Sequence, residues 1–140
     1  MFRETPGGRR ALARVKALCE RKEGRELDLS HCSMGYDGCR ALATPGCMVQ
    51  TQWVTKFSVA SNGISSDGVP YICTALRQMY RLSEVDLSCN SIQDSGVDTL
   101  VQALPALRGV TKLNLSSNDI SPIGAVALAD TLAKCQTVTE

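Results

Sequence analysis

Residues 82–92 read LSEVDLSCNSI, and residues 110–120 read VTKLNLSSNDI, so residues of the same type recur 28 positions later. Each copy is followed by a glycine and two leucines: Gly96, Leu100 and Leu104 after the first, and Gly124, Leu128 and Leu132 after the second. A fixed period of about 20–50 residues is typical of proteins built from stacked repeats. The sequence therefore predicts a solenoid.

The same pattern extends towards the N-terminus. Residues 54–64 read VTKFSVASNGI, and residues 27–34 read LDLSHCSM. One position of the repeat is always Asn or Cys, and it recurs in steps of 30, 28 and 28 residues at Cys32, Asn62, Asn90 and Asn118. The chain therefore holds about four repeats in register.

Each repeat combines two hydrophobic periods. Val85 and Leu87 alternate with polar neighbours, which is the period of a strand. Residues 97–104 instead carry apolar side chains at helical spacing. A strand, a turn and a helix per repeat predict parallel strands near 27–30, 56–59, 84–88 and 112–116, with Leu87 and Leu115 fully buried.

The pattern Leu-x-x-Leu-x-Leu-x-x-Asn/Cys-x-Leu, followed by a glycine and a helix, resembles the leucine-rich repeat family in its ribonuclease-inhibitor-like subclass. The resemblance covers residues 24–138 and implies an α/β solenoid. This would be a short right-handed horseshoe with about four parallel strands on its concave face and helices on its convex face. The Asn-or-Cys position of each repeat would form a buried structural ladder, whose side chains bond backbone groups that the turn leaves unpaired. Its members are Cys32, Asn62, Asn90 and Asn118.

The expected domain organisation is simple. Residues 1–8 are predicted to be a disordered lead, with residues 6–8 (PGG) as a helix breaker. Residues 9–23 are predicted to form an N-terminal capping helix with Leu12, Val15, Leu18 and Cys19 on one side. Residues 24–140 are predicted to be a single leucine-rich-repeat domain.

The later helices have predicted bounds as well. A short helix is expected near residues 37–43, and the next from Asp67 or Gly68 to about Tyr80, with Pro70 in its first turn. A third is expected from about Ser95 to Leu104. Ser121 and Pro122 give the last helix an N-cap followed by proline at the first helical position.

Composition excludes several classes of protein. The 140 residues are 44% apolar and carry a formal charge of +1, so no global field favours nucleic acid or a membrane. No apolar run reaches the roughly 20 residues that span a bilayer, and no signal peptide is predicted. The seven cysteines contain no CxxC pair. They predict reduced thiols in a cytoplasmic protein, with no disulfide and no metal site.

Polar side chains on the outward strand positions form the candidate protein-binding site. We call these residues the concave strip; its first column is Glu26, Lys56, Glu84 and Lys112, and its second column is Asp28, Ser58, Asp86 and Asn114. A third outward column, Ser30, Ala60, Ser88 and Ser116, is small and offers no anchor. Two interpretations stay open: the charges pair with one another and set the sheet register, or they recognise a partner.

A second candidate is a basic set at the N-terminus: Arg9, Arg10, Arg14, Lys16, Arg21 and Lys22. It is either a solvated cap face or a contact for an acidic partner such as a tubulin tail, an acidic protein or RNA. RNA ranks last because no aromatic residues interleave the charges. Trp53 is either a packing residue or, if exposed, a binding anchor.

No catalytic constellation is expected, and no cofactor or small-molecule substrate. His31 adjoins Cys32, but Cys32 occupies the buried Asn position, where a nucleophile could not reach substrate. The predicted function is a non-enzymatic scaffold or protein-binding module, docked as a small subunit in a larger assembly. The resemblance implies cytoskeletal or ciliary complexes among the contexts.

Three further expectations remain. The alternative functions are a GTPase-activating or inhibitor-type regulator and, third, binding of RNA or an acidic partner through the basic helix. Nucleic acid and membrane are not expected as partners. The strand near 112–116 is predicted to be a sheet edge with unpaired backbone groups, beside a last helix whose apolar side is half covered.

Overall fold

The computed structural model describes residues 5–21, 25–48, 51–135 and 138–140 of the chain. Its helices are α1 (Pro6–Arg21), α2 (Gly35–Ala43), α3 (Val69–Leu76), α4 (Gln93–Ala103) and α5 (Pro122–Lys134). Its strands are β1 (Glu26–Asp28), β2 (Lys56–Ser58), β3 (Glu84–Asp86) and β4 (Lys112–Asn114). Two 3-10 turns, η1 (Ser66–Gly68) and η2 (Leu104–Ala106), precede α3 and follow α4.

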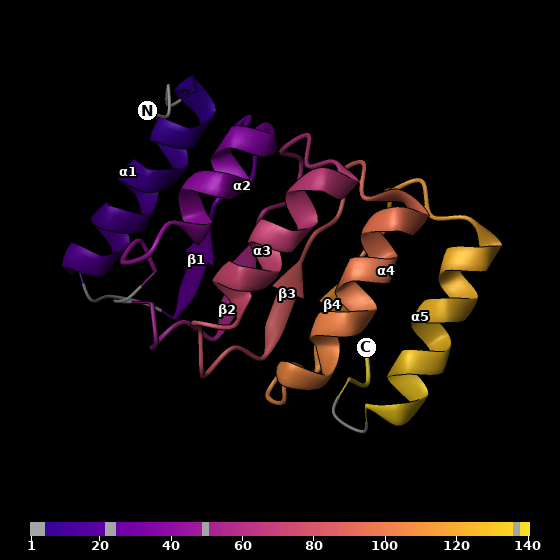
Figure 1. Ribbon diagram of the computed structural model, residues 1–140. Helices are drawn as coiled ribbons and strands as arrows, with labels where there is room; N and C mark the ends of the chain where they lie inside the picture. The colour runs from indigo at the N-terminus through magenta and orange to yellow at the C-terminus, as the bar shows by residue number, and fades with distance from the viewer. Residues whose placement is uncertain (1–4, 22–24, 49–50, 136–137) are drawn as a thin grey trace.

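The four strands form one parallel sheet in the order β1-β2-β3-β4. Glu26, Lys56, Glu84 and Lys112 are register partners across it, as the repeat period predicts. The helices lie side by side in a layer on one face of the sheet (Figure 1). The predicted leucine-rich-repeat solenoid is therefore confirmed, with strands that begin where expected or a residue earlier and are shorter than expected.

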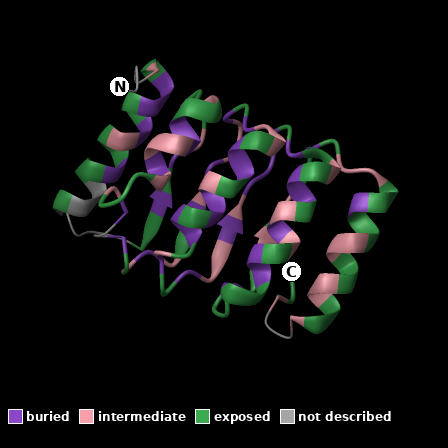
Figure 2. Cartoon of the chain, viewed as in Figure 1, coloured by how far each residue is buried: buried purple, intermediate pink, exposed green. Residues whose placement is uncertain are grey.

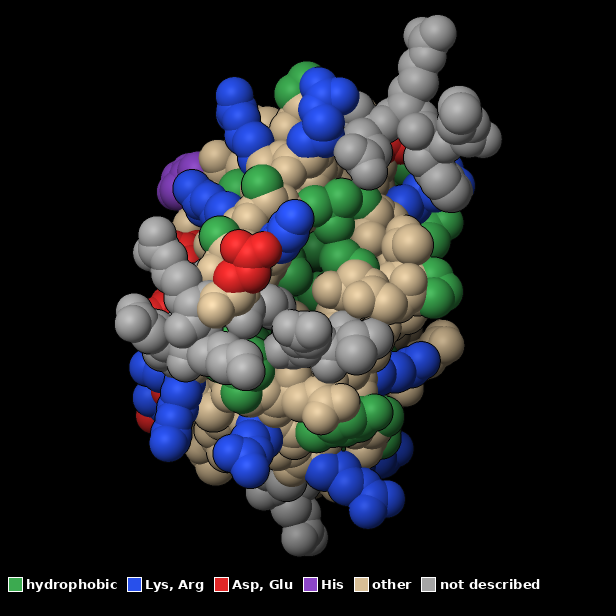
Figure 3. Space-filling view, turned by 90° about the vertical axis from the view of Figure 1, so that its left-hand side faces the viewer, with side chains coloured by type: hydrophobic (Ala, Val, Ile, Leu, Met, Phe, Trp, Pro, Cys, Tyr) green, Lys and Arg blue, Asp and Glu red, His purple; other side chains and the backbone are tan. Residues whose placement is uncertain are grey.

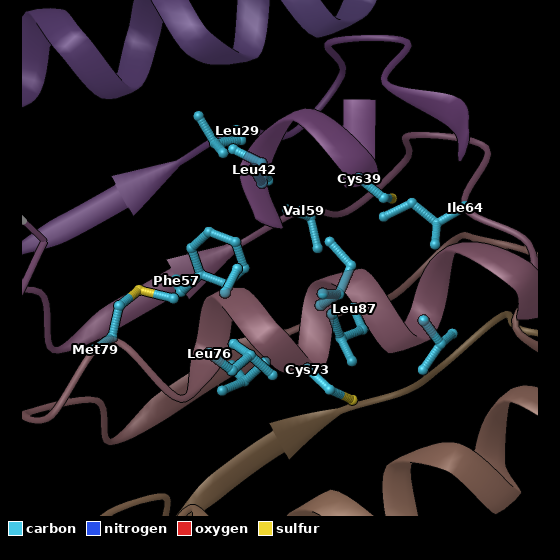
Figure 4. Close-up of a cluster of buried hydrophobic side chains, with 14 of the residues drawn as sticks. Leu29, Cys39, Leu42, Phe57, Val59, Ile64, Cys73, Leu76, Met79 and Leu87 are labelled. Atoms are coloured by element: carbon cyan, nitrogen blue, oxygen red, sulfur yellow. The ribbon is translucent and has the colours of Figure 1, made fainter. Parts of the chain in front are cut away.

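The hydrophobic core fills the space between the sheet and the helix layer. Figure 2 shows buried residues on the helix faces turned towards the strands. In the close-up of Figure 4, Phe57, Val59 and Leu87 point from the strand segments towards Leu76 of α3. Leu87 is only 2% exposed, as predicted.

Leu115 was expected to be equally buried, and that prediction is wrong. Its side chain is only partly buried, as is that of Leu113. Both belong to the last described repeat, and only Cys135 and residues 138–140 follow α5 among those described. A strand residue of this fold needs a neighbouring repeat on each side to be fully covered.

The predicted Asn ladder is buried. Asn62, Asn90 and Asn118 are each at most 7% exposed. The Nδ2 of Asn90 donates to the backbone oxygens of Leu87, Ser88 and Val59, and its Oδ1 accepts from the amides of Asn62 and Ile64. Each Asn therefore ties its own turn to that of the preceding repeat.

Residues 6–8 are not a helix breaker, because α1 begins at Pro6. A Cβ on Gly7 would overlap the backbone carbonyl of Ser33, so glycine lets α1 pack against the turn before α2. Val15 of α1 is buried and Leu12 is partly buried, as predicted. Residues 1–4 and 22–24 and the side chains of Leu18 and Cys19 lie outside the described part.

Several helix bounds differ from expectation, and α2 begins at Gly35 rather than near residue 37. α3 ends at Leu76 rather than near Tyr80, because the chain continues in tight turns in which the amides of Gln78 and Met79 donate to Ala75 and Leu76. α4 begins at Gln93, two residues earlier than expected. The predicted start of α5 is confirmed, since the Ser121 hydroxyl accepts from the amide of Ile123 at 3.2 Å.

The prediction of an unpaired edge at β4 is partly wrong. The amide of Leu113 donates to the carbonyl of Glu140 at 2.8 Å, and the amides of Thr139 and Glu140 donate to Thr111. Residues 138–140 thus begin to pair with β4 as a further strand would. The predicted half coverage of α5 is confirmed: Leu128 and Leu132 are partly buried, while Ile123 is 80% exposed.

Candidate protein-binding surface

The face of the sheet turned away from the helices is an open groove of about 740 Å³. All eight residues of the concave strip line it, and His31 and Glu140 join them. The sequence did not single out Glu140, although it stands 28 residues after Lys112 and so in the same column. The repeat brings the strip together because equivalent outward positions of parallel strands stack in register.

The first column of the strip alternates in charge and is partly paired. Lys56 Nζ lies 3.4 Å from a carboxylate oxygen of Glu84, and Lys112 Nζ lies 3.3 Å from Glu140. These pairs are solvent-exposed, so each contributes only about 0.2–1 kcal/mol. Glu26 makes no ion pair with any residue that the structure describes.

Side chains of the second column accept hydrogen bonds from residues of the third column. Asp86 Oδ1 accepts from the amide and the hydroxyl of Ser88 at 2.9 and 2.6 Å. Asp28 with Ser30 and Asn114 with Ser116 repeat this arrangement. The small serines, which looked featureless in the sequence, therefore fix the direction of the strip's side chains.

Burial raises the pKa of Asp28, but the two hydrogen bonds from Ser30 and the nearby charge of Arg14 outweigh it and hold that pKa below its usual value. Asp28 is therefore ionised at neutral pH. Five carboxylates (Glu26, Asp28, Glu84, Asp86 and Glu140) and two lysines line the groove, a balance of −3. The groove can thus offer carboxylate acceptors to a cationic partner.

Two members of the N-terminal basic set, Arg14 and Lys16, make separate contacts in the described part of the chain. Arg14 Nη1 donates to the backbone oxygens of Ser30 and Asp28 at 3.1 and 3.4 Å, so it is tied to the end of β1. Lys16 instead pairs with Glu20 at 4.0 Å. Figure 3 shows this end of the molecule, with Lys and Arg side chains spread around an apolar centre. The side chain of Arg21 and the whole of Lys22 lie outside the described part.

A family model described as a leucine-rich repeat matches residues 25–43, 82–101 and 109–129. Three of the chain's repeats therefore match the leucine-rich repeat family. Its assignment to the ribonuclease-inhibitor-like subclass stays a prediction.

Solved structures share this fold. The structure titled leiomodin-1 actin-binding site 2 has a TM-score of 0.70 at 18% identity, over 91% of this chain and 73% of that one. The tropomodulin C-terminal domain of Caenorhabditis elegans has a TM-score of 0.71 at 10% identity, over 94% and 78%. No curated protein matches in sequence. At these identities the likeness concerns the fold.

Within this leucine-rich-repeat chain, the thiols lie mostly in the core. Cys32 is 1% exposed, and its Sγ donates to the carbonyl of Ser30, whereas His31 is exposed at the surface. The six cysteines in the described part are free. In that part no group of His, Cys, Asp or Glu could hold a metal ion, and no helix is long and apolar enough to cross a membrane.

The convex face carries an aromatic cluster that sequence reasoning missed. Tyr36 and Tyr71 contact edge to face at 5.5 Å between ring centroids, their hydroxyls lie 3.1 Å apart, and Arg40 lies over the Tyr36 ring. The hydrogen bond to Tyr71 raises the pKa of Tyr36. No local spacing predicts the pair, because it depends on how α2 and α3 align. Trp53 is partly buried and packs against the core.

Proposed function

We propose that this protein is a non-enzymatic protein-binding module that docks into a larger assembly through its concave strip. The observation that carries the proposal is the groove itself. It runs across all four strands, is open to solvent, and has a lining whose charge balance is −3. A basic segment of a partner fits it best, since Lys or Arg side chains could bond carboxylates that already point outwards.

The strip is built to keep its shape. Backbone hydrogen bonds fix the strands, and the serines hold the second column of side chains. A partner therefore meets side chains that need little ordering on binding, which lowers the entropic cost of association. Glu26 also forms no ion pair with a described cation. Its free carboxylate favours recognition of a partner over a purely structural role for the charges.

The assembly we propose is cytoskeletal. Support comes from the leiomodin-1 structure, whose name identifies it as an actin-binding site and whose fold is the same. Co-sedimentation of the purified chain with actin filaments tests this part alone. Pelleting that saturates would support it; a chain that stays in the supernatant at all actin concentrations would restrict the proposal to another partner.

The strip itself is tested by charge reversal. Glu26→Lys with Glu84→Lys changes the net charge by four and makes the first column basic on all four strands. Asp98→Lys with Asp130→Lys makes the same change on α4 and α5, away from the groove. Both variants are compared with the unaltered chain by affinity purification, following the abundance of the protein recovered most strongly with the unaltered chain.

We expect the strip variant to lose that protein and the helix variant to keep it. Thermal unfolding checks that both variants are folded, since exposed charges contribute little to stability. Retention by a folded strip variant would refute the proposed surface. Equal loss in both variants would show a response to net charge and would also refute it.

A further inference from the structure

A second surface lies at the edge of the solenoid where helices end and strands begin. Between the loop after α3 and the loop after α4 is a pocket of about 140 Å³. Its floor is apolar and buried, formed by Leu76, Met79, Leu82, Leu107 and Val110. The rest of the lining is exposed and comes from Arg77, Tyr80, Ala106, Arg108 and Gly109. None of these residues belongs to the concave strip.

The pocket is held open by backbone geometry. The amides of Met79 and Leu82 donate to Leu76 and Met79, and those of Leu107 and Val110 donate to Leu104 and Leu107. A Cβ on Gly109 would lie 2.9 Å from the Leu82 carbonyl oxygen, so glycine lets the two loops approach closely. The pocket therefore exists before any partner binds.

The charged residues of the two loops that form the pocket are all basic. Residues 76–83 read LRQMYRLS and residues 104–111 read LPALRGVT, with three arginines and no carboxylate. None of Arg77, Arg81 and Arg108 makes an ion pair with a described residue. The helix dipole explains a cation at Arg77, the C-cap of α3, but its effect fades within one turn and does not reach Arg81 or Arg108.

We propose that this pocket binds a short acidic peptide segment of a partner, with one apolar side chain in the pocket and carboxylates on the arginines. A cavity of about 150 Å³ can hold benzene, so the size suits one aliphatic or small aromatic side chain. Arginine binds carboxylate in a two-pronged geometry. Tyr80, 76% exposed, adds an aromatic contact of the kind that dominates protein interfaces.

The observations favour a peptide over nucleic acid. Single-stranded nucleic acid needs successive aromatic platforms along a basic groove, whereas the pocket has one tyrosine and an aliphatic floor. The arginines also flank the pocket closely rather than following an extended path, since they come from two adjacent loops. The proposal does not depend on the concave strip and is tested by a separate experiment.

The experiment is fluorescence polarisation with labelled acidic heptapeptides. The probes have the form EEDxDEE, where x is Leu, Ile, Met, Phe or Gly, and the competitors are a lysine-flanked peptide KKKLKKK and oligodeoxythymidine. The variants are Arg77→Glu and Arg108→Glu, and the matched control is Lys16→Glu, which reverses an exposed cation on α1. Circular dichroism confirms that each variant is folded.

We expect saturable binding of at least one apolar-centred peptide, at least tenfold weaker binding of the glycine peptide, and a similar loss in both arginine variants but not in Lys16→Glu. Binding should also weaken as salt is raised. The proposal is overturned if no acidic peptide binds, if the glycine peptide binds equally well, if Lys16→Glu has the same effect, or if oligodeoxythymidine binds more tightly than every peptide.

Discussion

At the scale of single residues, the Asn side chains are the strongest link between repeats. Asn90 makes five hydrogen bonds, two of them accepted from the turn of the preceding repeat. Cys32 stands at this position in the first repeat, and its thiol is a much weaker donor. The backbone amide of Cys32 donates to Asn62 Oδ1, one repeat further on, at 2.9 Å.

Asn90→Ala is therefore expected to destabilise the protein by about 3 kcal/mol or more, because several buried backbone groups would lose their partner. The matched control is Asn114→Ala, whose side chain is exposed and bonds only Ser116. That change should cost less than about 1 kcal/mol. Urea unfolding followed by circular dichroism measures both, and a neutral Asn90→Ala would contradict the ladder.

Two buried thiols should make stability depend on pH. Burial raises the pKa of Cys39 to about 12 and that of Cys73 to about 11. In the unfolded chain thiols ionise near pH 8.5, so above about pH 9 the unfolded state has lost protons that the folded state keeps. The free energy of unfolding must then fall as pH rises from about 9 towards 11.

The expected loss is about 2 kcal/mol per thiol at pH 10, obtained by applying the linkage relation to these pKa values. It is measured by urea unfolding at pH 7.5 and pH 10. Cys73→Ala should reduce the pH dependence, while replacement of the exposed Cys89 by Ala should leave it unchanged. A pH dependence that is the same in all three proteins would exclude this cause.

At the scale of the elements, burial of equivalent strand positions changes along the stack. Leu87 follows β3 in the interior of the solenoid, and Leu115 follows β4 in the last described repeat. The same residue type at the same repeat position is thus fully covered in one case and partly covered in the other. Comparing Leu87 with Leu115 therefore separates the contribution of the neighbouring repeat to burial from that of the residue type.

Leu87→Ala should cost about 2–5 kcal/mol, the range for truncation of a buried leucine. Leu115→Ala should cost clearly less, because part of its side chain already contacts water. Denaturant unfolding of the two variants gives the difference directly. Equal losses would mean that the last described repeat is packed as tightly as the interior.

The elements also show how far the sequence alone could reach. The period of 28 residues correctly predicted the strand register and the order of the elements, because each repeat carries the full hydrophobic pattern of a strand, a turn and a helix. It failed at residues 6–8, where a proline and two glycines look like a breaker. Gly7 is required instead by a contact with Ser33, far along the chain, which no local pattern records. The Tyr36–Tyr71 pair was missed for the same reason.

Of the candidate site, the concave strip was predictable and its internal bonding was not. Outward strand positions follow from alternation, so the lining of the groove could be written down from the sequence. Whether Asp86 points into the groove or bonds Ser88 depends on side-chain geometry. The pocket near Tyr80 was invisible because it forms between two loops of different repeats.

At the scale of the whole molecule, the two ends of the sheet differ. α1 covers the side of β1 (Figure 1), whereas the edge of β4 that faces away from β3 pairs only with residues 138–140 among those described. The amides of Leu87 and Cys89 donate to Asn114 and Ser116 of the next repeat. The amides of Leu115 and Ser117 have no such bond to a described residue.

We therefore expect faster hydrogen exchange at Leu115 and Ser117 than at Leu87 and Cys89 in the isolated protein. If a partner also covers this end, exchange at residues 114–117 should slow in the native complex. Exchange mass spectrometry with short overlapping peptides resolves these positions. Equal protection of both pairs in a dilute monomer would show that this end needs no partner.

The central claim, that the concave strip contacts the partner, is tested most directly by site-specific photo-crosslinking in the native assembly. A benzophenone amino acid is placed at Ser58 in the groove or at Thr74 on the exposed side of α3. The account predicts that the Ser58 probe yields a covalent adduct with one defined protein and that the Thr74 probe does not. An adduct from Thr74 alone would contradict it and place the partner on the helices.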